Sequence, residues 1–192
     1  MILLVDLCYK PGSLSRYEFV DPIARIVAGA GYGVTIVHYS EIRKPMPDAD
    51  AVILCGTALA DNAFLADPDV FSWITACSCP VLGICAGMQA IVRCFGGTIT
   101  ERCEIGMTDI RVTAADPLLG TPRTFSAYEL HGFAVGSPGV LTVCAESACC
   151  IQAVRHPSRP VYGVMFHPEV RNEWVVEDFV RREVPERGPP PC

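Results

Sequence analysis

A cysteine between two glycines stands at the centre of the stretch VLGICAGMQAI, residues 81–91. An apolar run precedes Cys85 and a helix-like pattern follows it, which predicts a tight strand-to-helix turn. Gly83 and Gly87 supply the small neighbours that such a turn needs. A side chain at this corner projects from the carboxyl edge of a sheet, and the start of the next helix favours its thiolate form. Cys85 is therefore a candidate nucleophile, although a packed cysteine in a tight turn would produce the same pattern.

A second motif with chemical potential, GVMFHPEV, lies at residues 163–170. His167 and Glu169 are two residues apart, so in an extended segment their side chains project to the same side. Pro168 between them steers His167 away from helical geometry. A carboxylate beside an imidazole fixes its tautomer and stabilises the imidazolium that forms on proton uptake. Alone, this pair could equally be a helix cap or a solvated ion pair. Together with Cys85, it predicts a Cys-His-Glu catalytic set.

The elements that must position these groups follow from the hydrophobic pattern. Buried strands are predicted at 1–6, 33–39, 51–55 and 80–84, and helices at 21–31, 67–78 and 86–97. Because strands alternate with helices, we expect a doubly wound, mostly parallel α/β sheet flanked by helices, of the flavodoxin-like kind.

After Gly97 the pattern changes to short β-rich runs with turns between them. These runs lie at 97–120, 123–135, 140–146, 149–156 and 159–166. They predict a mixed or antiparallel region that either extends the sheet or packs beside it. A last helix is expected within 168–184. The prediction is one domain over residues 1–184 and a disordered, proline-rich tail at 185–192.

Composition excludes several classes of function. Of the 192 residues 51% are hydrophobic and 19% are charged, which favours a sheet buried on both faces. The net charge of −6 disfavours binding to nucleic acid or to an anionic membrane. No apolar run approaches the ~18 residues that cross a bilayer, and the first residues lack a basic segment, so we expect a cytoplasmic protein.

The eleven cysteines are expected to be reduced in that compartment, since their odd number does not suit a fully paired framework. The sequence contains no C-x-x-C pair, and the closely spaced pairs at 77/79 and 149/150 lack a second half at metal-ligand spacing. We therefore predict neither a metal site nor a cofactor.

The two motifs together carry a resemblance to a known family. GICAGMQ at 83–89 and FHPEV at 166–170 stand 82 residues apart from Cys85 to His167 (167 minus 85). In this order and spacing they resemble the class I, triad-type glutamine amidotransferases, and the resemblance covers nearly the whole chain. Within that family, the stretch from EIGMTDIRV through DPLLG to YELHGFAV is most similar to the glutaminase part of GMP synthetase.

The resemblance implies a reaction and assigns the roles in it. Cys85 would attack the side-chain amide carbon of glutamine, and His167 would take the thiol proton and pass one to the departing ammonia. Water activated by His167 would then hydrolyse the γ-glutamyl thioester, while Glu169 orients the imidazole. The oxyanion would be held by the backbone N–H of Ala86 and by that of Gly56 or Thr57.

The resemblance also implies that Gln89, one helical turn beyond Cys85, helps to hold the substrate, with His131 as a second substrate-binding candidate. For His131 a structural or interface role is at least as well supported, because its neighbours Leu130, Gly132 and Phe133 are not the polar ones of the family.

Two further departures concern the oxyanion loop and the segment before His167. The loop reads Cys55-Gly56-Thr57-Ala58 where the family has Ser-Gly-Gly-Pro. A β-branched Thr57 resists the positive φ that glycine allows, so we expect a displaced donor or a loop that rearranges. Met165 replaces a glutamine, a mild change if the side chain is buried.

The leading hypothesis is a glutaminase that supplies ammonia to a separate chain. The sequence has no G-x-x-x-x-G-K-[ST] motif, so an ATP-dependent synthetase partner, in this interpretation a GMP synthetase, would activate the acceptor. Two alternatives stay open: a stand-alone γ-glutamyl hydrolase that uses the same three residues, and a non-catalytic regulatory or binding protein with the same fold.

Overall fold

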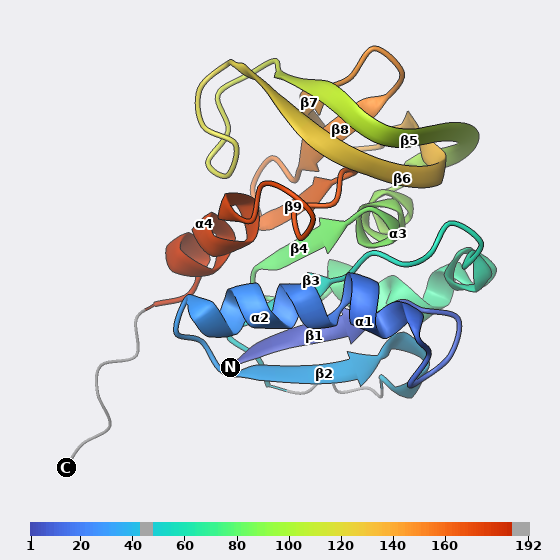
Figure 1. Cartoon of the computed structure of the whole chain (residues 1–192), viewed down its shortest axis with the longest axis vertical. Coiled ribbons are helices and arrows are strands. Elements are labelled where there is room, and N and C mark those ends of the chain that lie inside the picture. Colours follow the sequence, from blue (N-terminus) through green and yellow to red (C-terminus); the bar gives the residue numbers. More distant parts are fainter. Residues whose placement is uncertain (43–47, 186–192) are drawn as a thin grey trace.

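The computed structural model describes residues 1–42 and 48–185. Within this part of the chain the strands form one nine-stranded sheet in the order β2-β1-β3-β4-β9-β8-β7-β5-β6 (Figure 1). Its parallel strands are β1 (Ile2–Asp6), β2 (Val34–His38), β3 (Ala51–Leu54), β4 (Val81–Ile84) and β9 (Val161–Val164). The predicted α/β fold with a parallel sheet is thus confirmed.

The β-rich second half extends the same sheet in antiparallel fashion. It contributes β5 (Thr98–Val112), β6 (Thr124–Ser137), β7 (Thr142–Glu146) and β8 (Ile151–Arg155). Strand β9 joins the two parts, since it is parallel to β4 and antiparallel to β8. The expectation of short strands is wrong for β5 and β6, which form a long hairpin of 15 and 14 residues. The register of the β5–β6 pairing shifts between Glu101 and Glu104, and the two strands remain paired on either side of this shift.

Helices cover both faces of the parallel part. Successive residues of β1 alternate between the faces: Ile2 and Leu4 pack in one hydrophobic cluster, and Leu3 and Val5 in the other. The first cluster includes residues of α2 (Asp21–Gly29) and α4 (Trp174–Glu183), and the second includes residues of α3 (Ala86–Cys94). This two-sided covering explains why β3, in the middle of the parallel part, is apolar and buried at every position.

One of the predicted helices needs correction. The segment predicted as a helix at 67–78 is the 3-10 helix η3 (Pro68–Thr75), in which Phe71 and Ile74, three residues apart, are both buried. The last helix, expected within 168–184, is found there as α4, which begins at Trp174 after Asn172 has adopted a φ of 95°. Three short elements were not predicted: α1 (Ser15–Phe19), η1 (Tyr39–Glu41) and η2 (Ala63–Leu65).

The structure also bears on the expectations about the cysteines, membrane spans and the C-terminal tail. Cys77 and Cys79 form a disulfide, contrary to the expectation that all cysteines are reduced, because the turn after η3 brings their Cα atoms to 5.5 Å. No helix in the described ranges is long and apolar enough to cross a membrane. The tail predicted at 185–192 lies, apart from Pro185, outside the described residues.

Candidate active site

The pairing of β4 with β9 brings the two predicted motifs together. These strands are parallel and in register from Val81 and Val161 to Ile84 and Val164, so the residues that follow them leave the sheet at the same edge. The backbone N–H of Cys85 donates to the carbonyl of Val164 at 2.8 Å. Positions separated by 82 residues in the sequence thereby become neighbours.

Cys85 occupies a strained turn that only small neighbours permit. Its φ of 49° and ψ of −104° lie in a region that non-glycine residues rarely adopt. A Cβ atom on Gly83 would stand 2.5 Å from the carbonyl carbon of Gly87, and one on Gly87 would stand 2.3 Å from the backbone oxygen of Leu54. Both positions therefore exclude any side chain, and the turn holds the thiol at the start of α3.

His167 is fully buried and is fixed from several sides. Its Nδ1 donates to Glu169 Oε1 at 2.8 Å, so the proton of the neutral ring resides on Nδ1. Its backbone N–H donates to the carbonyl of Tyr128 at 2.8 Å, and the ring of Phe19 packs against the imidazole with centroids 5.4 Å apart. His167 Nε2 has no hydrogen-bond partner within residues 1–42 and 48–185, which leaves it available to take a proton.

Electrostatics favour the charged form of this imidazole. Burial alone would lower the pKa of His167, but the negative charges of Glu169 and of Cys85 outweigh burial and raise that pKa well above its ordinary value. An imidazole of this kind can hold a proton that it takes from a neighbouring group.

Gly56 lies directly against both candidate catalytic residues. A Cβ atom at this position would stand 2.7 Å from His167 Cε1, 3.2 Å from His167 Nδ1 and 3.7 Å from Cys85 Cβ. The loop after β3 thus reaches the thiol, as the oxyanion-hole assignment requires. Among the described non-glycine residues only Cys85 and Asn172 have a positive φ, so Thr57 adopts its place without the strain expected from its β-branch. Ala86 is the first residue of α3, and its N–H has no acceptor within the helix.

A small pocket lies beside the thiol. Its walls are the loop from Thr57 to Phe64, the start of α3 with Cys85, Ala86 and Gln89, and the β6 segment from Leu130 to Phe133. The thiol points toward this last wall, since Cys85 Sγ lies 3.7 Å from the carbonyl oxygen of Leu130. A molecule that reaches the thiol would have to enter between the thiol and β6.

The two predicted substrate-binding residues behave differently. Gln89 lines the pocket, and its Nε2 donates to the carbonyl of Phe133 at 2.9 Å. His131 is in the same wall, but its Nδ1 donates to the carbonyl of Arg102 at 3.1 Å and its Nε2 faces Glu129 at 3.3 Å. Both ring nitrogens are thus engaged by groups outside the pocket wall, which favours the structural role over the substrate contact.

The family model for glutamine amidotransferase class-I matches residues 16–183 of this chain. The chain belongs to the class-I glutamine amidotransferases. The resemblance stated from the two motifs is confirmed.

Relatives of this class-I amidotransferase include a subunit of the glutamine-hydrolysing GMP synthase of Pyrococcus abyssi, which is 36% identical over 107 residues, 53% of this chain and 57% of the relative. The glutamine-hydrolysing GMP synthase of Thermobifida fusca is 39% identical over 174 residues, 78% of this chain and 32% of that protein. The chain therefore spans about half the length, or less, of these relatives.

Among solved structures, a protein of Thermoplasma acidophilum provisionally described as a GMP synthase subunit superposes with a TM-score of 0.78. It is 25% identical, and the match covers 94% of this chain and 93% of that one. The architecture of the amidotransferase fold is thus shared over nearly the full length.

Sequence reasoning missed several contributors to this amidotransferase site. Phe19, which packs on the imidazole, belongs to a five-residue helix with no clear signal. Asp61, which accepts a hydrogen bond from Thr57 Oγ1 at 2.8 Å, could have been suspected from its place four residues after the loop threonine. The carbonyls of Leu130 and Phe133 leave no trace in residue types, because every residue carries such a group.

Proposed function

We propose that this protein hydrolyses the side-chain amide of glutamine. Cys85 attacks the amide carbon, and His167 takes the thiol proton and gives it to the amide nitrogen, which leaves as ammonia. The γ-glutamyl thioester on Cys85 is then attacked by water, whose proton passes to His167. Glutamate leaves and the thiol is restored. Glu169 keeps Nδ1 protonated so that Nε2 does both transfers.

The observation that carries this proposal is the convergence at one sheet edge of a strained cysteine and a buried imidazole–carboxylate pair. Neither feature is needed for stability, since a positive φ at Cys85 and a buried, unpartnered Nε2 at His167 both cost free energy. The N–H groups of Ala86 and of Gly56 or Thr57 are proposed to hold the oxyanion, at about 3 kcal/mol of transition-state stabilisation for each donor.

The resting position of the thiol suggests that the site is gated. Cys85 Sγ faces the carbonyl of Leu130, and Leu130 is part of the wall that glutamine must pass. For the proposed reaction the thiol has to turn toward His167 Nε2 and the β6 segment has to move outward. Such a rearrangement, driven by docking of a second chain, would couple glutamine hydrolysis to the presence of an acceptor.

We propose that this second chain is an ATP-dependent synthetase in the cytoplasm, and that it makes GMP. The support is the identity of the relatives, several of which are subunits of glutamine-hydrolysing GMP synthases. Exposed apolar side chains at the mouth of the site also suit a docked partner: Leu59 lines the pocket, and Tyr9, whose backbone N–H donates to Asp61, is half exposed.

The test combines labelling with turnover. The purified protein is exposed to a glutamine-mimicking electrophile, the modified residue is mapped by mass spectrometry, and glutamate release is measured in parallel. We expect modification at Cys85 and no glutamate release from Cys85→Ala, while Cys103→Ala, which removes an exposed cysteine on β5, behaves as wild type. Glutamate release by the Cys85→Ala protein would refute the mechanism.

The same assay separates the alternatives. Slow release that a synthetase chain accelerates supports the gated glutaminase. Rapid release without a partner, together with cleavage of N-substituted γ-glutamyl amides, would indicate a stand-alone hydrolase. Absence of labelling and of turnover even with the synthetase present would indicate a non-catalytic binding protein.

A further inference from the structure

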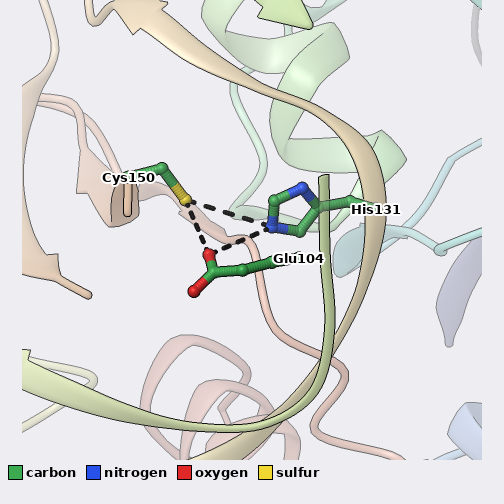
Figure 2. Close-up of side chains that lie close together, drawn as sticks. All are labelled: Glu104, His131 and Cys150. Atoms are coloured by element: carbon green, nitrogen blue, oxygen red, sulfur yellow. Dashed lines mark hydrogen bonds and ion pairs between the residues drawn. The ribbon is translucent and has the colours of Figure 1, made fainter. Parts of the chain in front are cut away.

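A cluster of metal-binding groups lies beside the active-site wall and has no part in the proposed reaction. Glu104 on β5, His131 on β6 and Cys150 in the turn between β7 and β8 turn their polar atoms toward one another (Figure 2). Glu104 and His131 are directly opposite in the β5–β6 pairing. Their ligand atoms, with Cys150 Sγ, all lie within 4.8 Å of one another.

We propose that Glu104, His131 and Cys150 form a binding site for Zn²⁺. A thiol, an imidazole and a carboxylate are the donor set of a borderline-soft ion, and not of Mg²⁺ or Ca²⁺, which prefer oxygen ligands alone. Three protein ligands leave a fourth position for water.

The spacing of the three atoms suits a tetrahedral ion. With metal–ligand distances of about 2.3 Å to sulfur and about 2.0 Å to nitrogen and oxygen, the ligand atoms stand about 3.3 to 3.6 Å apart. The structure places Cys150 Sγ 3.2 Å from Glu104 Oε2, Glu104 Oε2 3.6 Å from His131 Nε2, and Cys150 Sγ 3.9 Å from His131 Nε2. Shifts of a few tenths of an ångström would complete the coordination.

The surroundings already orient the ligands. A carbonyl can only accept, so the contact of His131 Nδ1 with the carbonyl of Arg102 fixes the proton on Nδ1 and leaves the lone pair of Nε2 facing the cluster. Glu104 Oε2 accepts from Gln152 Nε2 at 3.2 Å and lies 3.3 Å from Ser147 Oγ. These contacts are of the kind that hold metal ligands in place.

A second and independent observation points to a missing positive charge. The Glu129 side chain is fully buried, and neither of its oxygens accepts a hydrogen bond in the described part of the chain. Its Oε2 lies 3.3 Å from the same His131 Nε2. A divalent cation bound by the cluster would place a positive charge beside the two carboxylates, and the thiol proton would leave to solvent when sulfur binds.

The site would tie β5, β6 and the turn between β7 and β8 together next to the catalytic pocket. His131 follows Leu130, whose carbonyl faces the thiol, and precedes Phe133, whose carbonyl holds Gln89. Zinc would therefore fix the β6 wall that the gating described above requires to move. The binding itself does not depend on the proposed glutaminase activity.

The test is zinc binding to the metal-free full chain, measured by competition with a chromophoric chelator, with Co²⁺ as a probe of thiolate ligation. We expect one ion per chain and a thiolate-to-cobalt absorption band. Cys150→Ser should abolish the band and weaken Zn²⁺ binding by about 100-fold or more, since even the partners that orient a ligand are worth 10- to 100-fold. Glu104→Gln should also weaken it, and the adjacent exposed cysteine supplies the matched control, Cys149→Ser, which should bind as wild type.

The catalytic cysteine is the competing thiol, so Cys85→Ala is measured as well and should retain the ion. Thermal denaturation verifies that each variant is folded. If Cys150→Ser does not fold, Glu104→Gln still tests the site. Wild-type protein that binds no zinc at micromolar concentration would overturn the proposal and leave a hydrogen-bonded ion-pair cluster. Retention of binding in Cys150→Ser with loss in Cys85→Ala would overturn it in favour of an ion on the catalytic pair.

Discussion

Replacing Gly56 by alanine should impair the chemistry without affecting the fold or the entry of substrate. The added Cβ would stand 2.7 Å from His167 Cε1, whereas ordinary contact begins at 3.4 Å. The imidazole or the loop must therefore shift by at least 0.7 Å, the difference between these distances. Gly56 lacks a positive φ, so alanine adds no backbone strain there and the effect is steric.

A misplacement of about 1 Å at a catalytic group can cost about 100-fold in rate, so we expect kcat to fall by roughly 25- to 100-fold. That corresponds to about 2–3 kcal/mol of activation free energy. KM should change little, because the pocket wall begins at Thr57. The assay is glutamate release over a range of glutamine concentrations, with the rate of Cys85 labelling as a second readout.

The matched control is Gly132→Ala, which adds the same atom to the opposite wall of the pocket. There the nearest atom, Leu59 Cδ1, would be at 3.7 Å, an ordinary contact, so kcat should stay within a few-fold of wild type. A Gly56→Ala protein with wild-type kcat would refute the packing argument. Equal losses in the two variants would show that the pocket, and not the imidazole, is sensitive.

Three further outcomes follow from the same geometry. Because the pKa of His167 is raised in the folded protein, protonation of His167 stabilises the fold at and below about pH 6.5, and this stabilisation is lost as pH rises through the folded pKa. Urea unfolding of Glu169→Gln should therefore show its largest loss of unfolding free energy, relative to wild type, just below pH 6.5. A loss that does not vary with pH would contradict this. Gly87→Ala forces an atom to 2.3 Å from a backbone oxygen and should lower the unfolding free energy by about 3 kcal/mol or more, with a much reduced midpoint in thermal denaturation. Gln89→Met removes the donor to the Phe133 carbonyl, and we expect a several-fold higher KM with a smaller change in kcat, as measured by steady-state kinetics; an unchanged KM would exclude Gln89 from the pocket's function.

The parallel half of the fold could be predicted because its signals are local. Runs such as Ala51–Leu54 and Val81–Ile84 are apolar at every position, as strands covered on both faces must be. Cys85 could be predicted to lie in a tight turn because the turn requires glycine at two nearby positions, and both glycines are visible in the sequence. His167 and Glu169 followed from their spacing of two.

The antiparallel half was less predictable because its information is long-range. No sequence signal near Glu104 indicates that this residue lies opposite His131, because the register is set by the whole length of the β5–β6 hairpin. Cys150 joins them from a third segment, so no spacing rule for metal ligands could find the group. The 3-10 form of η3 was missed because an Asp-Pro start fits either kind of helix.

The position of β9 in the middle of the sheet has a consequence for how the protein comes into being. This strand is made after the eight others, yet it must enter between β4 and β8, where it joins the two parts of the sheet. His167 follows it by three residues, so the proposed base is made only after the strand that joins the two parts of the sheet. A growing or truncated chain that carries Cys85 but lacks β9 thus leaves the edges of β4 and β8 unpaired and lacks the proposed base for its thiol. Under the proposed mechanism, completion of the sheet and acquisition of activity would be a single event, and unfinished chains would not hydrolyse glutamine.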